Sequence, residues 1–212
     1  MELETIYKPI HDELKKVEAA LINEVSAGNP FISSICKYAF RSPGKRLRPA
    51  LTLFSSKVGG TKVKQAAIDV AAAVELIHTA TLVQDDVIDK ASIRRGQKTV
   101  GAVFGGDISI LFGDYLFSKS FSLLAKLRKS ELLYLLSEVT NTMAAGEMEQ
   151  LFFAGKSISE KRYFEIIRNK TAILFSASCE MGAIIGGLKK KQIRALADFG
   201  LHFGLAYQII DD

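Results

Sequence analysis

The sequence predicts an all-α protein, and the placement of proline and the spacing of apolar residues carry this prediction. The 212-residue chain has four prolines, Pro9, Pro30, Pro43 and Pro49, all in its first 49 positions. Because a proline inside a helix costs about 3 kcal/mol, their absence from the rest of the chain favours long helices. Apolar residues recur there at steps of three and four, as between Val103 and Tyr115, and no stretch alternates over the length of a strand.

Four helices are expected in the first part of the chain, at residues 3–26, 31–39, 47–58 and 62–90. The turn-forming run Gly28-Asn29-Pro30 separates the first two, and Gly59-Gly60 ends the third. Pro49 is compatible with the first turn of that third helix. The fourth is largely apolar from Ala71 to Val83, as a core helix would be.

Four further helices are expected at 104–127, 130–154, 159–186 and 190–212, with Gly155 and Gly186-Gly187 marking helix ends. No linker, low-complexity segment or internal repeat is recognisable, so residues 1–212 are interpreted as a single domain.

Charge and cysteine usage narrow the class of partner. The formal charge of +5 favours an anionic partner, but no basic stripe with interleaved aromatic residues is present, so nucleic acid is not expected. The densest basic segment, GKRLRP at 44–49, is compact enough to suit an anionic small molecule.

Cys36 and Cys179 lack any metal-binding or disulfide spacing, which is typical of a reducing, cytoplasmic location. The N-terminus does not resemble a signal peptide, and charges interrupt the apolar runs, so no membrane-spanning helix is expected.

Two acidic clusters lie where helices disfavour them. Asp85 and Asp89 share one face at the end of the apolar fourth helix, where like charges cost about 0.2–0.5 kcal/mol and the helix dipole adds to the penalty. Asp86 lies between them, and Asp211-Asp212 closes a second apolar run. A solvated helix end is the simplest explanation of one such pair. Three aspartates on so apolar a helix favour a functional site, and carboxylates without His or Cys favour Mg²⁺.

Basic residues surround these clusters in the sequence. Arg94 and Arg95 follow the first cluster closely, Lys45, Arg46 and Arg48 belong to GKRLRP, and Lys170 interrupts a semi-apolar helix. Each alone would be read as a solvated surface charge. Together with carboxylates for a metal, they predict a site for a diphosphate.

Six motifs in this order resemble those of the trans-isoprenyl diphosphate synthases, or polyprenyl synthetases, from about residue 30 to the end. They are Gly44-Lys45-Arg46-Leu47-Arg48-Pro49, Glu75-Leu76-Ile77-His78-Thr79, Asp85-Asp86-Val87-Ile88-Asp89, Arg94-Arg95-Gly96, Lys170-Thr171 and Tyr207-Gln208-Ile209-Ile210-Asp211-Asp212. The resemblance implies a bundle of mostly antiparallel helices around a deep apolar cavity, usually as a homodimer. It also implies head-to-tail condensation of isopentenyl diphosphate with an allylic diphosphate. Because the product is hydrophobic, the resemblance further implies loose association with membranes through that product.

The resemblance assigns roles residue by residue. Asp85, Asp89 and Asp211 would bind Mg²⁺ ions that bridge the allylic diphosphate, with Asp86 in support and Arg94 contacting that diphosphate. Four residues match the isopentenyl diphosphate site, namely Lys45, Arg48, His78 and Arg95. Three would contact the allylic group and its developing charge, namely Lys170, Thr171 and Gln208. The catalytic set implied is Asp85, Asp86, Asp89, Arg94 and Lys170.

This chemistry needs a dry cavity, because water would quench the allylic cation. Candidate lining residues are Phe112, Met143, Met148 and Phe152, for which simple core packing is the alternative. Ala80 and Thr81 lie five and four positions before Asp85. A bulky aromatic residue at either position would close the bottom of the cavity and stop growth of the prenyl chain. Both are small, which predicts a product of C20 or longer.

The second aspartate motif stops at Asp212, whereas family members continue beyond it. The chain therefore resembles a C-terminally truncated member, and a non-catalytic partner subunit or fragment is the alternative function. A terpene cyclase is disfavoured by GKRLRP and by the second aspartate pair. A ferritin-like di-iron bundle is suggested only by the Glu75 to His78 spacing and lacks the second such motif, which neither His11 nor His202 supplies.

Overall fold

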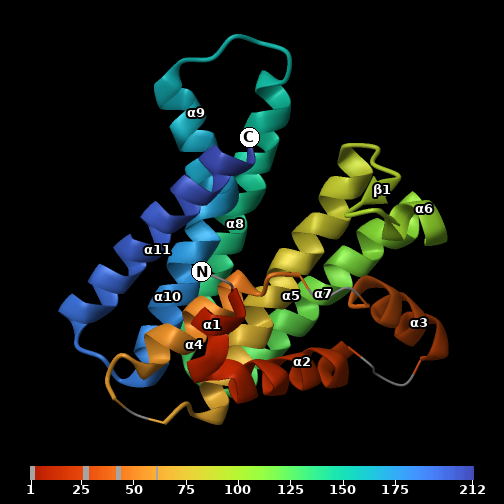
Figure 1. The fold of residues 1–212 in the computed structure, drawn as a ribbon. Helices are drawn as coiled ribbons and strands as arrows, with labels where there is room; N and C mark the ends of the chain where they lie inside the picture. The colour runs from red at the N-terminus through yellow and green to blue at the C-terminus, as the bar shows by residue number, and fades with distance from the viewer. Residues whose placement is uncertain (1–2, 26–28, 42–43, 61) are drawn as a thin grey trace.

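The computed structural model describes residues 3–25, 29–41, 44–60 and 62–212, and its regular structure is almost entirely helical, as predicted (Figure 1). The first elements are α1 (Leu3–Tyr7), a 3₁₀ stretch η1 (Lys8–Ile10), α2 (His11–Val25), α3 (Pro30–Ala39), α4 (Leu47–Lys57) and α5 (Gln65–Ile88). The predicted first helix is therefore divided at η1, which contains Pro9. Its predicted end at residue 26 lies outside the described residues. The second, third and fourth predicted helices agree with α3, α4 and α5 to within three residues.

The later elements are α6 (Val100–Phe104), α7 (Gly106–Lys126), α8 (Ser130–Phe153), α9 (Glu160–Ile167), a π-helical stretch η2 (Arg168–Ala172), α10 (Ile173–Gly186) and α11 (Lys190–Asp211). Two predictions need correction. The helix predicted at 104–127 is broken at Gly105, whose φ of 98° lies outside the helical region. The helix predicted at 159–186 is continuous only through η2, which contains Lys170 and Thr171.

A two-stranded hairpin, absent from the prediction, links α5 to α6. Strands β1 (Ile93–Arg94) and β2 (Gln97–Lys98) pair antiparallel, with Arg94 opposite Gln97. The two residues between them, Arg95 and Gly96, have φ values of 51° and 74°. Positive φ at both positions is the signature of a type I′ turn, the tight turn that fits the twist of a hairpin.

Helix α5 forms the centre of the core. Ala71, Ala72 and Ala73 are fully buried, and α5 packs against α2, α4, α7 and α10. Helix α10 also packs along α4, where a Cβ on Gly182 would lie 2.2 Å from the carbonyl oxygen of Thr52. Only glycine permits this close crossing. In Figure 1, α8, α10 and α11 stand beside one another, while the hairpin and α6 extend from the far end of α5 and α7.

Two helices are long and apolar enough, by length and composition alone, to cross a membrane, a test that buried core helices also pass. They are α5 and α7. Two thirds of the most apolar window of α5 is buried inside the protein, as in the core helix of a soluble protein, whereas 39% of the window in α7 is buried.

Candidate active site

The GKRLRP loop is fixed before α4 by a charged network. Arg46 adopts the left-handed conformation at φ 49° and makes ion pairs with Glu18 of α2 and, at 2.6 Å, with Glu75 of α5. Although burial acts in the opposite sense, these two carboxylates raise the pKa of Arg46. The Tyr7 hydroxyl donates to the carbonyl oxygen of Lys45 at 2.7 Å. The loop is thereby tied to two helices and to the N-terminal segment.

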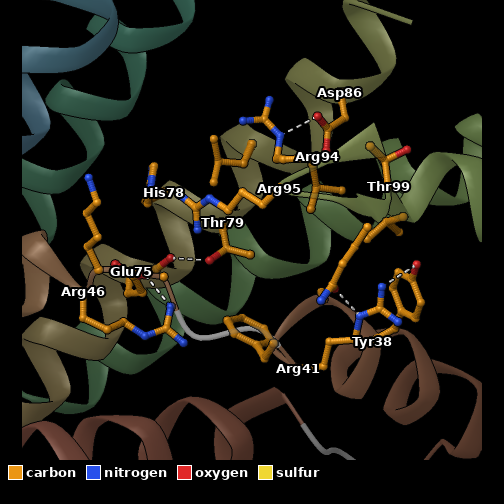
Figure 2. Close-up of a pocket in the computed structure, with 18 of the residues that line it drawn as sticks. Tyr38, Arg41, Arg46, Glu75, His78, Thr79, Asp86, Arg94, Arg95 and Thr99 are labelled. Carbon is orange, nitrogen blue, oxygen red and sulfur yellow. Dashed lines mark hydrogen bonds and ion pairs between the residues drawn. The ribbon is translucent and has the colours of Figure 1, made fainter. Parts of the chain in front are cut away.

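A cavity lies between this loop, α3, α5 and the hairpin, and it gathers all four residues predicted to bind isopentenyl diphosphate (Figure 2). These are Lys45, Arg48, His78 and Arg95. The absence of a side chain at Gly44 leaves room for Arg95, because a Cβ there would lie 2.8 Å from Nη1 of Arg95. The missing side chain lets the Arg95 guanidinium lie against the loop. The cavity is therefore rich in cationic side chains, which suits an anionic group.

Arg48 supplies a buried cation with unused hydrogen-bonding capacity. Its guanidinium lies over the Phe175 ring, 4.1 Å from the ring centre, and its Nε has no hydrogen-bond partner. Burial lowers the pKa of Arg48 to about 10. A buried donor without a partner is costly, and because this nitrogen is shut off from solvent, Arg48 would act on an anion in the cavity through the charge of its guanidinium.

His78 is neutral in this setting. Burial is the main cause that holds its pKa well below the ordinary value, and the charges of Arg48 and Arg95 add to it. A neutral imidazole can donate one hydrogen bond to a phosphate oxygen without adding a further positive charge. Glu75, which the ExxH spacing had placed in a conceivable metal site, is instead paired with Arg46.

The aspartates of the first acidic cluster have different neighbours, because Asp86 contacts the hairpin whereas Asp85 lies near charges of α8 and η2. Asp86 is buried and accepts a hydrogen bond from Nε of Arg94 at 2.6 Å, which ties the end of α5 to the hairpin. Asp85 is partly buried, and its pKa is raised to about 6 by burial and then by the charge of Glu147, against the opposing effect of Lys170. Asp89 is exposed at the end of α5 and raises that pKa further.

Lys170 reaches the same region from the opposite side of the bundle. Its Nζ lies 2.5 Å from Oε2 of Glu147 on α8. Gly146 makes this pairing possible, because a Cβ there would lie 2.8 Å from the backbone nitrogen of Lys170. Helix α8 thus packs directly on the backbone of η2. Sequence reasoning missed Glu147, and the only available signal was a glycine in the interior of a helix.

Thr171 and Gln208 lie in a second cavity with Lys170, between α8, α9, η2 and α11. The Thr171 hydroxyl donates to Oε1 of Gln208 at 2.9 Å, and Nε2 of Gln208 donates to Oδ1 of Asp212 at 2.7 Å. The Tyr163 hydroxyl donates to the other oxygen of Asp212, which raises the pKa of Tyr163. Asp212 is thus engaged by protein partners, and both it and the neighbouring Asp211 are exposed.

The three carboxylates predicted to bind metal come from different elements, Asp85 and Asp89 from α5 and Asp211 from α11. Among the described residues, no group of three or more His, Cys, Asp or Glu side chains is close enough to hold an ion. The donor set still fits Mg²⁺, because Asp85 and Asp89 are carboxylates one helical turn apart beside the further negative charge of Glu147.

The residues proposed for chain length and cavity lining differ in exposure. Ala80 is fully buried in the core, whereas Thr81 is partly exposed and donates to the carbonyl oxygen of His78. Phe112 and Met143 are core residues, and Met148 and Phe152 are about two-thirds exposed. None of these four lines either cavity described above, so the deep apolar cavity stays a prediction.

Comparison with known proteins agrees with this geometry. The family model described as Polyprenyl synthetase matches residues 29–212. The chain is 34% identical to octaprenyl diphosphate synthase of Escherichia coli over 213 aligned residues, covering all of this chain and 66% of that protein. It is 33% identical to component 2 of heptaprenyl diphosphate synthase of Bacillus subtilis, of which it covers 61%.

Solved structures give the same result. A polyprenyl synthase from Caulobacter crescentus, crystallised with calcium and isoprenyl diphosphate, superposes with a TM-score of 0.95 at 33% identity, over the whole of this chain and 64% of that one. A decaprenyl diphosphate synthase from Rhodobacter capsulatus also gives 0.95, at 36% identity and 65% of its length. The chain thus spans about two thirds of the length of these relatives. On its sequence, its fold and the residues gathered in its basic cavity, the chain belongs to the polyprenyl synthetase family.

Proposed function

We propose that this chain provides the substrate-binding part of a prenyltransferase that joins isopentenyl diphosphate head to tail with an allylic diphosphate. The observation that carries the proposal is the basic cavity, where Lys45 of the loop, Arg48 of α4, His78 of α5 and Arg95 of the hairpin come together. The buried guanidinium of Arg48, which lines this cavity without an ion pair among the described residues, supports the binding of an anion there. The names of the octaprenyl, heptaprenyl and decaprenyl relatives support a long product, C20 or longer.

The chain's residues would divide the work between two diphosphates. Lys45, Arg48 and Arg95 would hold isopentenyl diphosphate through its charge, and neutral His78 would donate one further hydrogen bond. Arg94, whose Nε is bound to Asp86, keeps its terminal nitrogens available for the allylic diphosphate. In the reaction the allylic C–O bond breaks, the double bond of isopentenyl diphosphate forms the new C–C bond, and a proton leaves to the released diphosphate.

Asp85, Asp89 and Asp211 would hold Mg²⁺, which supplies charge stabilisation to the departing diphosphate when bound. The Caulobacter crescentus relative, crystallised with calcium and isoprenyl diphosphate, supports a divalent cation. Lys170 would add a point charge near the same oxygens once it leaves Glu147. Thr171 and Gln208, which line the second cavity and are hydrogen-bonded to each other, would contact the allylic group and its developing charge.

Assembly and location are part of the proposal. We propose a homodimer in the cytoplasm, with loose attachment to membranes through the product. The two described cysteines are free and buried, which suits a reducing compartment. The relative named as one component of a heptaprenyl diphosphate synthase supports a second candidate, a subunit that acts with a different partner chain.

The test is a prenyltransferase assay with Mg²⁺, radiolabelled isopentenyl diphosphate and separate C5, C10, C15 and C20 allylic primers. We expect long products from the wild-type chain and none from Asp85→Ala. The matched control is Asp69→Asn at the opposite end of α5, which should retain wild-type activity. If this chain and a version extended past Asp212 are both silent with every primer, the proposed reaction is wrong. Activity only in the extended version, or only with a second subunit, supports the partial-chain alternative.

A further inference from the structure

Helix α3 is fastened to the hairpin by a group of side chains that lies outside all six motifs. Nε of Arg41 donates to Oε1 of Gln97 at 2.6 Å, and its terminal nitrogen donates to the Tyr38 hydroxyl at 3.0 Å. The Tyr38 hydroxyl in turn donates to the carbonyl oxygen of Lys98 at 2.8 Å. We call these three side chains, Tyr38, Arg41 and Gln97, the clasp. Figure 2 shows Tyr38 and Arg41 on the side of the basic cavity opposite Arg46 and Glu75.

The clasp holds the hairpin at the position that controls Arg95. Gln97 is paired with Arg94 across the hairpin, and Arg95 is the first residue of the turn between them. Fixing Gln97 therefore fixes the base of the turn from which the Arg95 side chain reaches the cavity and Gly44. Each strand has only two residues, and so short a hairpin needs contacts from elsewhere to keep its position.

Electrostatics favour such a hold. Arg95 enters a cavity that also contains Lys45 and Arg48, whose like charges oppose its position, while the carboxylates of Glu75 and Asp86 are already paired with Arg46 and Arg94. The clasp adds no ion pair of its own on the hairpin. It uses a neutral amide and a tyrosine ring, 3.9 Å from the Arg41 guanidinium to the ring centre. The Tyr38 ring also packs edge-on against Phe104 of α6, which anchors the clasp from the apolar side.

We propose that Arg41 is a positioning residue that acts through Gln97 to hold Arg95 in the basic cavity. It thereby sets the affinity for the diphosphate of isopentenyl diphosphate without touching the reacting atoms. The inference rests on the proposed function for the identity of the ligand. The competing explanation is an exposed polar contact of the kind that contributes almost nothing, because Arg41 lies at the protein surface.

The test compares Arg41→Met with Lys37→Met, which removes the same charge from an exposed position in the last turn of α3, four residues before Arg41. We expect Arg41→Met to weaken isopentenyl diphosphate binding, measured by calorimetry, and to raise its KM by about five- to thirtyfold. The KM of the allylic primer and kcat should stay within about twofold, as should every parameter of Lys37→Met. Gln97→Glu, which keeps a partner for Arg41, should retain tight binding, whereas Gln97→Ala should behave like Arg41→Met.

Hydrogen exchange supplies a readout that does not depend on the ligand. Amides at 93–98 should exchange at least about fivefold faster in Arg41→Met and Gln97→Ala than in the wild type, with the α5 amides unchanged. Unchanged binding in Arg41→Met, or equal loss of affinity for both substrates, would overturn the proposal. If the wild type neither binds isopentenyl diphosphate nor turns over, the proposed function fails. The clasp is then judged by exchange alone, and unchanged hairpin exchange overturns it.

Discussion

Nζ of Lys170 lies 2.5 Å from Oε2 of Glu147, and both charges act on Asp85 at the end of α5. Three charged groups from α5, α8 and η2 therefore share one small region, although 85 positions separate Asp85 from Lys170 in the sequence. The protonation of Asp85 is the most direct report on this arrangement.

Asp85 should make stability depend on pH when no divalent cation is present. Its pKa of about 6 in the folded protein lies above the ordinary value of 3.8, mainly because of burial. Folding therefore favours its protonated form, and the free energy of unfolding should rise as the pH falls through 6 and level off near 4. We expect a gain of about 1–3 kcal/mol relative to Asp85→Asn. Urea denaturation in EDTA at several pH values measures it, and a constant difference between the two proteins would contradict it.

Arg48 should lower the free energy of unfolding of the protein while strengthening the binding of isopentenyl diphosphate. Its guanidinium is buried with a lowered pKa and an unpartnered Nε, so Arg48→Met should increase the free energy of unfolding by about 1 kcal/mol or more. The same change should weaken isopentenyl diphosphate binding at least about tenfold, because a charged contact is lost. The exposed Arg194→Met should change neither quantity. A less stable Arg48→Met would show that the stacking on Phe175 outweighs the cost of burial.

Gly44→Ala should act on binding rather than on folding. The new Cβ would meet Nη1 of Arg95, the mobile end of a long side chain that can move aside at little cost. We expect the free energy of unfolding to change by less than about 0.5 kcal/mol. The KM of isopentenyl diphosphate should rise about threefold or more, since Arg95 is displaced. Gly106→Ala, whose Cβ would lie at an ordinary 3.6 Å from Val87, is the control for helix and backbone effects.

Product length is best tested at Thr81. Because Thr81 is partly exposed and Ala80 is fully buried, Thr81→Phe can project its ring without disrupting the core. We expect shorter products from Thr81→Phe, resolved by chromatography of the extracted prenyl chains. Ala80→Phe should also shorten them but should cost about 1–3 kcal/mol of stability through overpacking. An unchanged product distribution in a folded Thr81→Phe would refute a chain-length role for this part of α5.

The helices were predictable because their signals are local. The absence of proline after Pro49, the glycine pairs and the apolar spacing locate α5, α8 and α11 within a few residues. The hairpin was not predictable in this way, because two-residue strands leave no alternation to detect. Its only local sign was Gly96 after two arginines, where the turn requires positive φ at Arg95 as well. The π-helical stretch η2 likewise packs at Lys170 against Gly146 of α8, a tertiary contact that no local pattern signals.

The candidate site shows the same division. The motif residues of the basic cavity were identified from their order along the chain, and the fold brings them together. Glu147, Arg41 and Gln97 were missed, since each is an ordinary polar residue on a helix or turn. Their importance comes from what lies opposite them in space. Sequence reasoning finds groups whose chemistry is unusual where they stand, and it misses those that act through a neighbour.

The π-helical stretch η2 also governs the phase of the helix that follows it. One extra residue in a helix turns everything after it by about 100° around the axis, since an α-helix has 3.6 residues per turn. The faces of α10 are therefore rotated about the axis relative to α9, compared with the faces of an uninterrupted α-helix. Removing one residue from 168–172 would rotate Gly182 away from Thr52 and bring a larger side chain to the crossing with α4. The wide turn that carries Lys170 and Thr171 is thus also what keeps α10 packed against the core.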